Sequence, residues 1–275
     1  MKNICVVFCC NANYLHKFKI TFHQLINNGK YNGDVCLIVG DDLKNIGKDD
    51  YIIKNNIIIK YFKNLEILSN TTFLQQQKLL IRPGTHWFSK RFQYHKFYLF
   101  DVFFKNWNYI CYIDCGMTIY SDISPILNEK LANKLLANRD GVDNENAGWC
   151  VPITPGLGLK LGDQFTKTEL LYKELEKNYI LNKSYFQTTL MLFDTSIINN
   201  ETFNNLYSLL QKYPISITND QGIIALYFTQ IKPCWEQLRR KNNTIYFYDY
   251  VRCINSKYIM VKNTSNNWLN VGYNE

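Results

Sequence analysis

The stretch WNYICYIDCGMTIYSDISPIL, which runs from Trp107 to Leu127, carries the strongest indication of the fold. Its apolar first part reads as a buried strand that ends in the carboxylate of Asp114, and the chain then turns at Cys115-Gly116. An aspartate at the end of a buried strand places one negative charge at the edge of a crevice. Aspartate also caps turns and helices well, so this stretch alone leaves a structural role for Asp114 open.

Segments of strand and helix character alternate on both sides of this stretch. Residues 4–9 and 34–39 are apolar runs typical of buried strands, and the apolar spacing between them predicts a helix. This β-α-β opening indicates an α/β fold, a Rossmann-like open mixed sheet flanked by helices, with a ligand crevice at the carboxyl ends of the strands. Further strands are predicted at residues 56–62, 186–194 and 257–265, helices at 94–107, at 168–181 and from Asp220, and a polar loop at 128–147. No linker divides the sequence, so a single domain over residues 1–275 is predicted.

The composition excludes several classes of protein. Hydrophobic residues make up 47% of the 275 and aromatic residues 15%, which suffices for a packed core and is unlike a disordered chain. The net charge of +8 comes from scattered residues, and the densest basic cluster, LRRKNN at 238–243, is too short for a nucleic-acid arm. We therefore expect no nucleic-acid partner, and part of the positive charge is available to an anionic small molecule.

Cysteine usage and hydropathy indicate the compartment. The nine cysteines form no CxxC pair, and several lie inside apolar runs, where a free thiol behaves as a small buried hydrophobe. A disulfide framework is not expected, which predicts a reducing, cytoplasmic environment. No apolar run reaches the roughly 18 residues that a membrane-spanning helix needs, so no membrane span is predicted.

Four motifs of this sequence resemble those of the glycogenin-like GT-A glycosyltransferases, and they follow one another along the chain as in that family, over about residues 4–230. The run KFYLFDVFFKNWNYICYIDCGMTIYSDISPIL at 96–127 resembles the segment in which a strand of that family ends in an Asp-x-Asp motif. Asp114 takes the first position of the motif and Gly116 the last, which implies that both lie at the donor, although the motif is degenerate here. VVFCCNANYLHKFKI resembles the family's nucleotide loop, YFQTTLMLFDTSI its FNSGVxxF strand, and NDQGIIALYF its DQGxLNxxF helix. The resemblance implies a fold of the GT-A type.

The same resemblance implies roles for individual residues. Asn11 and Tyr14 would contact uridine, and Lys96 would reach the donor. Gln187 would turn its amide to the donor sugar, and Asp220 would be the acid beside that sugar. Enzymes of this family retain the anomeric configuration, and the catalytic residues that the resemblance implies are Lys96, Gln187 and Asp220. A structural interpretation stays open for each position: a loop aromatic, a hydrogen bond between strands, a helix N-cap, or a charged head in solvent.

The divalent metal is where this sequence departs from the family. There two aspartates and a later histidine hold Mn²⁺ or Mg²⁺ against the two phosphates, whereas Gly116 has no ligating side chain. All histidines of this chain precede Asp114: His16, His23, His86 and His95. Asp114 alone would bind a metal weakly. The alternative is that Lys262, close to the position of the family's histidine, and Arg252 replace the ion.

The predicted function is transfer of a hexose, with retention, from a UDP-sugar to an acceptor. The resemblance implies UDP-glucose, UDP-galactose or UDP-N-acetylglucosamine as donor, and a glycan, a glycoprotein or the enzyme itself as acceptor. Such chemistry needs a positive clamp on the leaving diphosphate and carboxylate or amide groups around the sugar. The missing aspartate and histidine favour an alternative, a catalytically silent relative that binds a nucleotide or a glycan. The oligomeric state does not follow from the sequence.

Overall fold

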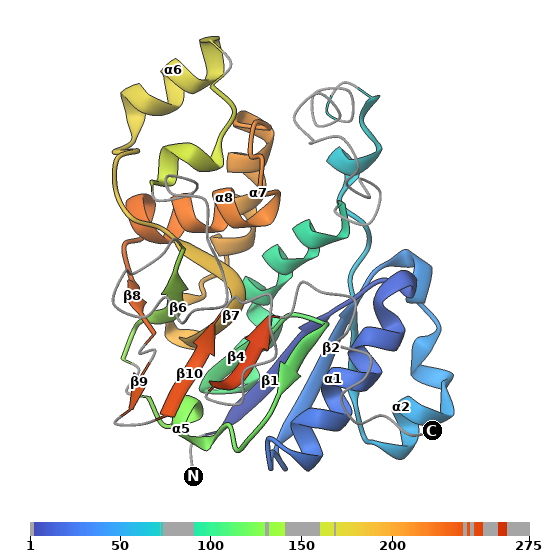
Figure 1. Cartoon of the computed structure of the whole chain (residues 1–275). Helices are drawn as coiled ribbons and strands as arrows, with labels where there is room; N and C mark the ends of the chain where they lie inside the picture. The colour runs from blue at the N-terminus through green and yellow to red at the C-terminus, as the bar shows by residue number, and fades with distance from the viewer. Residues whose placement is uncertain are drawn as a thin grey trace.

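The computed structural model of the chain describes residues 3–71, 73, 91–129, 132–140, 160–167, 169–238, 241–242, 245–249 and 258–262 (Figure 1). These residues build one large and one small β-sheet, with helices on both faces of the large sheet. The predicted α/β class is therefore confirmed. The single domain expected over residues 1–275 stays a prediction.

The large sheet has the strand order β3-β2-β1-β4-β7-β6-β8. Its strands are β1 (Ile4–Cys9), β2 (Asp34–Val39), β3 (Ile58–Tyr61), β4 (Tyr109–Ile113), β6 (Leu135–Arg139), β7 (Phe186–Asp194) and β8 (Trp235–Gln237). β1 to β4 run parallel, and β7 is antiparallel to both of its neighbours, β4 and β6. Parallel strands are covered on both faces, which explains why β1, β2 and β4 are nearly continuous apolar runs.

The order of the strands creates a switch point beside β1. The chain leaves β1 toward β2 and β3 on one side and returns to β4 on the other side, where Val7 lies opposite Tyr112. At such a point the connections after the two strands diverge and leave a crevice at the carboxyl ends. These connections begin at Cys10 and Asp114, so the fold brings two of the predicted donor segments together.

Helices pack on both faces of the large sheet, with α7 and α8 on one side and α1 on the other (Figure 1). The α-helices are α1 (Leu15–Asn27), α2 (Asp50–Lys54), α5 (Ser124–Leu127), α6 (Glu169–Asn178), α7 (Thr202–Lys212) and α8 (Asp220–Leu226), and a π-helical turn, η9 (Tyr227–Ile231), follows α8. The 3-10 segments are η1 (Ala12–Tyr14), η2 (Asp41–Leu43), η3 (Ile46–Lys48), η4 (Glu66–Ser69), η5 (Phe92–Phe100), η6 (Val102–Asn106), η7 (Leu161–Gln164) and η8 (Thr195–Ile197). Successive side chains of a strand point to opposite faces, so Val7 belongs to the core under η5 and Val6 to the core under α1.

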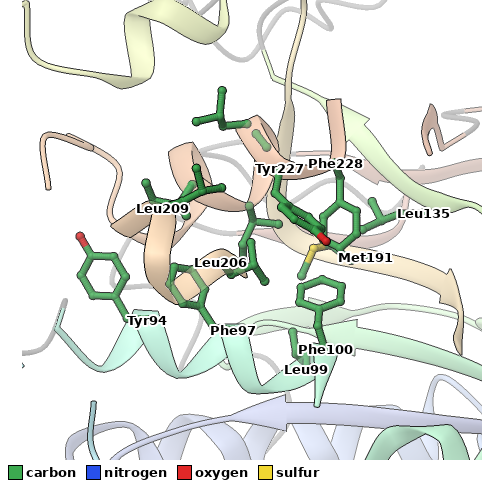
Figure 2. Close-up of a cluster of buried hydrophobic side chains, with 14 of the residues drawn as sticks. Tyr94, Phe97, Leu99, Phe100, Leu135, Met191, Leu206, Leu209, Tyr227 and Phe228 are labelled. Carbon is green, nitrogen blue, oxygen red and sulfur yellow. The ribbon is translucent and has the colours of Figure 1, made fainter. Parts of the chain in front are cut away.

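The helix predicted before β4 is present as two 3-10 segments, η5 and η6, which meet at Asp101. Tyr94, Phe97 and Phe100 recur every three residues, the spacing that aligns side chains on a 3-10 helix, and each is at most 1% exposed. Figure 2 shows these rings turned toward α7 and α8. This packing fixes η5, and with it Lys96, which lies among the buried positions.

A second, four-stranded sheet has the order β5-β11-β10-β9. Its strands are β5 (Met117–Ile119), β9 (Lys241–Asn242), β10 (Ile245–Asp249) and β11 (Tyr258–Lys262). β11 confirms the strand predicted near the end of the chain, and it pairs antiparallel with β5 so that Lys262 lies opposite Met117. Because β5 follows Asp114 directly, this pairing carries Lys262 to the crevice.

One prediction about the fold is wrong. Segment 128–147, expected to be a polar loop, contains β6. Its apolar run of Leu135, Leu136 and Ala137 is too short to indicate a strand, and the strand exists because it pairs with β7 and β8. The described part of the chain contains no helix that combines the length and the apolar character needed to span a bilayer.

Candidate active site

A cavity of about 300 Å³ lies at the switch point, bounded by the connections after β1 and β4 and by β7 and α8. Residues from all four segments quoted for the family resemblance line it, together with the last described strand. Six of the residues singled out in the sequence are among them: Asn11, Tyr14, Lys96, Asp114, Asp220 and Lys262. The structure thus brings most of the predicted donor-binding residues to one place.

Lys96, Asp114, Asp220 and Lys262 form a connected set of ion pairs, the charged cluster. Nζ of Lys96 lies 3.0 Å from Oδ1 of Asp114 and 3.3 Å from Oδ2 of Asp220. Nζ of Lys262 lies 3.3 Å from Oδ2 of Asp114 and also donates to the carbonyl oxygen of Cys115. Both oxygens of Asp114 are therefore in contact with an ammonium group.

Neutral groups hold the two carboxylates of the charged cluster in place. The hydroxyl of Tyr112 donates to Oδ1 of Asp114 at 2.5 Å, and the hydroxyl of Thr188 donates to Oδ2 of Asp220 at 2.7 Å. The side chain of Lys96 is 6% exposed, whereas that of Lys262 is 22% exposed. A buried ammonium requires compensating charge, and the two aspartates supply it to Lys96.

The electrostatic environment shifts the pKa values of the two aspartates in opposite directions. Burial raises the pKa of Asp114, but the ammonium groups of Lys96 and Lys262 outweigh burial, and the pKa falls to about 2. At Asp220 burial outweighs the attraction of Lys96, and the pKa is raised. Burial lowers the pKa of Lys96, but its two carboxylate partners raise it by more, so the ammonium stays charged. Acids whose pKa values are pushed apart by their surroundings are typical of active sites.

Asn11 and Tyr14 lie in the connection between β1 and α1. The hydrogen bond from the backbone N–H of Ala12 to Oδ2 of Asp42, at 2.8 Å, holds this connection in place. Asn11 is 8% exposed, and within the described ranges its Oδ1 has no hydrogen-bond partner. A buried acceptor without a partner costs free energy, so this oxygen is suited to receive a donor group of a ligand. Nζ of Lys17 lies 4.8 Å from the centroid of the Tyr14 ring.

Gly116 is not among the residues that line the cavity. Its φ of +87° lies in a region that side chains with a β-carbon rarely adopt, and its N–H donates to Oγ1 of Thr21 at 3.0 Å. A β-carbon built on Gly116 would lie 3.5 Å from Cδ of Lys17. The glycine therefore allows the chain to turn directly after Asp114, and its predicted donor contact stays a prediction.

Gln187 belongs to a second set of polar groups, the amide network, made of Asp140, Gln164, Tyr185, Gln187 and Gln221. Nε2 of Gln187 donates to Oδ1 of Asp140 at 2.9 Å. Tyr185 and Gln221 donate to Oδ2 of the same carboxylate, at 2.6 and 3.1 Å. Gln187 does not line the cavity, whereas Gln221 does. The predicted contact of Gln187 with the donor sugar stays a prediction.

Several residues of the cavity were not predicted from the sequence. Gln221 follows Asp220 within the quoted motif NDQGIIALYF, so that motif carried a signal for it. Tyr112 also carried a signal, because side chains two apart on a strand share one face and Tyr112 precedes Asp114 by two. Thr188 gave no such indication. Arg252, the second cation predicted to replace a metal, lies outside the described residues.

The described residues do not fit a divalent metal ion. Mn²⁺ and Mg²⁺ require several oxygen ligands, and the described ranges contain no group of three His, Cys, Asp or Glu side chains placed to hold an ion. The single carboxylate predicted as a ligand, Asp114, has both oxygens paired with lysines. An ion bound there would face two ammonium groups at short distance, and like charges repel.

Comparison with solved structures shows the fold. The galactosyltransferase LgtC, solved with donor and acceptor sugar analogs, superposes with a TM-score of 0.57 at 11% identity, over 95% of this chain and 87% of LgtC. The glycosyltransferase GlyE of Streptococcus pneumoniae TIGR4 gives 0.51 at 14% identity, over 89% of this chain and 47% of GlyE, so the chain spans about half of its length. Core-mannan synthase A of Aspergillus fumigatus, solved in a Mn/GDP form, gives 0.51 at 11% identity, over 90% of this chain and 76% of the synthase.

These likenesses confirm the GT-A type of fold that the sequence motifs implied. A comparison with curated protein sequences found no match. The sequence also matches Glycosyl transferase family 8 over residues 5–267, a range that includes every residue of the charged cluster. The glycogenin-like subgroup and the degenerate Asp-x-Asp motif stay predictions. The chain belongs to Glycosyl transferase family 8.

Proposed function

We propose that the protein transfers a hexose from a UDP-sugar to an acceptor with retention of the anomeric configuration. One observation carries the proposal: a cavity at the switch point of the large sheet is lined both by the charged cluster and by Asn11 and Tyr14. The first group suits a diphosphate and a sugar, and the second suits a base. Membership of a glycosyltransferase family supports the same conclusion.

Each of these residues has its own role in sugar transfer. Tyr14 stacks on the uracil, and the buried oxygen of Asn11 accepts a hydrogen bond from the nucleoside. Negative charge grows on the leaving diphosphate, and Lys262, the more exposed cation of the cluster, offsets it. Lys96 holds Asp114 and Asp220 in fixed positions, and Asp220, whose pKa is raised, lies beside the sugar.

Donor hydrolysis tests this proposal without knowledge of the acceptor. The full chain is incubated in turn with UDP-glucose, UDP-galactose and UDP-N-acetylglucosamine, and UDP release is measured. Proton NMR of the freed sugar at early times reports whether its configuration is retained. We expect one donor to be hydrolysed with retention, and Asp220→Asn to lower the rate by at least about 100-fold, the range typical of a group that acts on the reacting centre. A freed sugar of inverted configuration, or equal rates for the variant and the wild type, would contradict the assigned roles.

The alternative of a catalytically silent relative is favoured by one observation. Lys96 pairs with both aspartates of the cavity, so each carboxylate already has a cationic partner. In that case UDP would bind and raise the melting temperature by mass action, but no donor would be turned over.

A further measurement tests whether the enzyme itself is the acceptor. Mass spectrometry of the intact chain after incubation with donor would reveal self-glycosylation as the gain of a hexose.

A further inference from the structure

Asn219, the residue directly before α8, has a backbone conformation that glycine normally occupies. Its φ of 54° and ψ of −118° are typical of the first central residue of a type II′ turn. The N–H of Gln221 closes this turn by donating to the carbonyl oxygen of Thr218 at 3.3 Å. A β-carbon makes the conformation costly, and residues held in such conformations gather at functional sites. The other three residues of the turn, Thr218, Asp220 and Gln221, all line the cavity.

The side chain of Asn219 gives a reason for an asparagine at this position. Asn219 is 7% exposed, and its Nδ2 donates to Oε1 of Gln93 at 2.8 Å. Gln93 belongs to η5 and lines the cavity. A glycine would suit the backbone better, but it would remove the donor of this hydrogen bond. The position therefore combines two requirements, a positive φ and an amide group.

Asn219 and Asp220 connect the turn to one face of η5. Gln93 and Lys96 are three residues apart in this 3-10 segment, a spacing that places their side chains one above the other. Asn219 donates to Gln93, and Oδ2 of Asp220 lies 3.3 Å from Nζ of Lys96. Two adjacent links restrict the turn more than one does, because the carboxylate cannot shift along η5 while the amide stays bound.

Ser216 holds the turn through its backbone. The hydroxyl of Ser216 donates to the carbonyl oxygen of Asn219 at 2.7 Å, and Ser216 is 1% exposed. A β-carbon built on Gly222 would lie 2.6 Å from this hydroxyl oxygen, so the first turn of α8 packs directly against it. The peptide group that joins Asn219 to Asp220 is therefore fixed at its carbonyl oxygen.

We propose that Asn219 is a positioning residue, which holds the carboxylate of Asp220 beside Lys96 through its backbone conformation and its hydrogen bond to Gln93. The expected effect on the reaction rests on the proposed function, because it assumes that Asp220 acts on the donor sugar. Asn219 is not among the residues that line the cavity, so it acts through Asp220.

Asn219→Gly in the full chain tests the proposal, because glycine suits the backbone conformation and removes the amide. We expect kcat for donor hydrolysis, measured as UDP release, to fall by roughly 10–100-fold, as a small misplacement of a catalytic group can cause. KM for the donor and the calorimetric Kd for UDP should stay within about two-fold of the wild type, since binding of the nucleotide does not use Asp220.

Asn219→Ala separates the amide from the backbone. It loses the same hydrogen bond but keeps a β-carbon at positive φ, so it should melt at a lower temperature than Asn219→Gly. The two variants should lose kcat to a similar extent, because both lack the amide. A wild-type kcat in Asn219→Gly would show that Asn219 serves only the backbone and would overturn the inference.

A matched control and a double-mutant cycle isolate the hydrogen bond to Gln93. Asn133 also has a positive φ, 55°, and its Oδ1 accepts from the hydroxyl of Ser196, but it does not line the cavity. Donor hydrolysis should not change in Asn133→Gly. In a Gln93→Leu background, Asn219→Gly should lower kcat by less than about two-fold further, because the hydrogen bond is already absent. A full additional loss would contradict a role through Gln93.

A crystal structure of Asn219→Gly tests the position of Asp220 without any activity. We expect Nζ of Lys96 and Oδ2 of Asp220, which lie 3.3 Å apart in the wild type, to separate beyond about 4 Å, the largest distance of an ion pair. An unmoved Asp220 would overturn the inference. Absence of donor hydrolysis by the wild type would contradict the proposed function instead, and the crystal structure would still decide whether Asn219 positions Asp220.

Discussion

The charged cluster and the amide network adjoin each other at the start of β7 and differ in composition. The charged cluster combines two lysines with two aspartates and lines the cavity. The amide network surrounds one aspartate, Asp140, with glutamine amides and a tyrosine hydroxyl. Consecutive residues of β7 serve the two sets, because Thr188 donates to Asp220 and Gln187 donates to Asp140.

This difference indicates a division of labour. Buried ion pairs contribute little net stability, so a protein that keeps one at a cavity is expected to use it for binding or chemistry. Amide hydrogen bonds can join elements without burying opposite charges. The amide network connects β6, β7, η7 and the start of α8, and so fixes the helix whose first residue is Asp220. We therefore expect the charged cluster to act on the donor and the amide network to support it.

Removal of the shared cation should give the largest effect. Lys96→Met leaves Asp114 and Asp220 close together without the ammonium between them. Breaking a buried ion pair in this way typically costs about 3–5 kcal/mol of unfolding free energy, and donor hydrolysis should be lost. Urea denaturation followed by circular dichroism measures the cost. A loss below about 1 kcal/mol would show that the cluster is hydrated and that the contrast with the amide network is overstated.

The pH dependence of stability sharpens the comparison next. The folded-state pKa of Asp114, about 2, lies below the value of about 4 expected for the unfolded chain, so its contribution is fully present above about pH 4. It is lost as the pH falls toward 2 and amounts to about 2 kcal/mol. The pKa of Asp220 is raised, so its contribution has the opposite sign and declines as the pH rises. The difference in unfolding free energy between wild type and Asp114→Asn should therefore shrink as the pH falls toward 2. Urea denaturation at a series of pH values measures it, and a difference that stays constant with pH would contradict the assignment.

A matched pair of tyrosines compares the two sets directly. Tyr112 donates to Asp114 at 2.5 Å and Tyr185 donates to Asp140 at 2.6 Å, and both side chains are buried. Tyr112→Phe and Tyr185→Phe should each cost about 1–2 kcal/mol of unfolding free energy. Only Tyr112→Phe should also reduce donor hydrolysis at saturating donor, because only its partner belongs to the charged cluster. Equal kinetic effects of the two substitutions would remove the distinction.

The smallest expected effect comes from the two glutamines. Gln187→Ala and Gln221→Ala each remove amide hydrogen bonds, at about 1 kcal/mol of unfolding free energy. Gln221 lines the cavity, so its substitution should lower the rate of donor hydrolysis more than that of Gln187 does. A larger rate loss for Gln187 would support its predicted contact with the donor sugar and would place the amide network within the catalytic site.

Much of the fold could be predicted because its signals are local. Strands that are covered on both faces of a sheet have nearly continuous apolar sequences, and such a run predicts the parallel strands β1, β2 and β4 and also the antiparallel strand β7. β6 could not be predicted in this way, because its apolar run is short and it becomes a strand only by pairing with β7 and β8. The helix before β4 was found, but its 3-10 form was not, since the three-residue spacing of its aromatic residues fits both kinds of helix.

For the candidate site, the sequence alone determined that Asp114 ends a buried strand, that Gly116 offers no ligand, and that Lys96, Asp220 and Lys262 lie in recognisable segments. Only the tertiary structure decided which charges meet. Lys96 bridges two aspartates that are far apart in the chain, and Lys262 reaches Asp114 across 148 residues. The physical reason is one of range: backbone propensity acts over a few neighbouring residues, whereas an ion pair forms wherever the packing of sheets and helices brings opposite charges within a few ångströms.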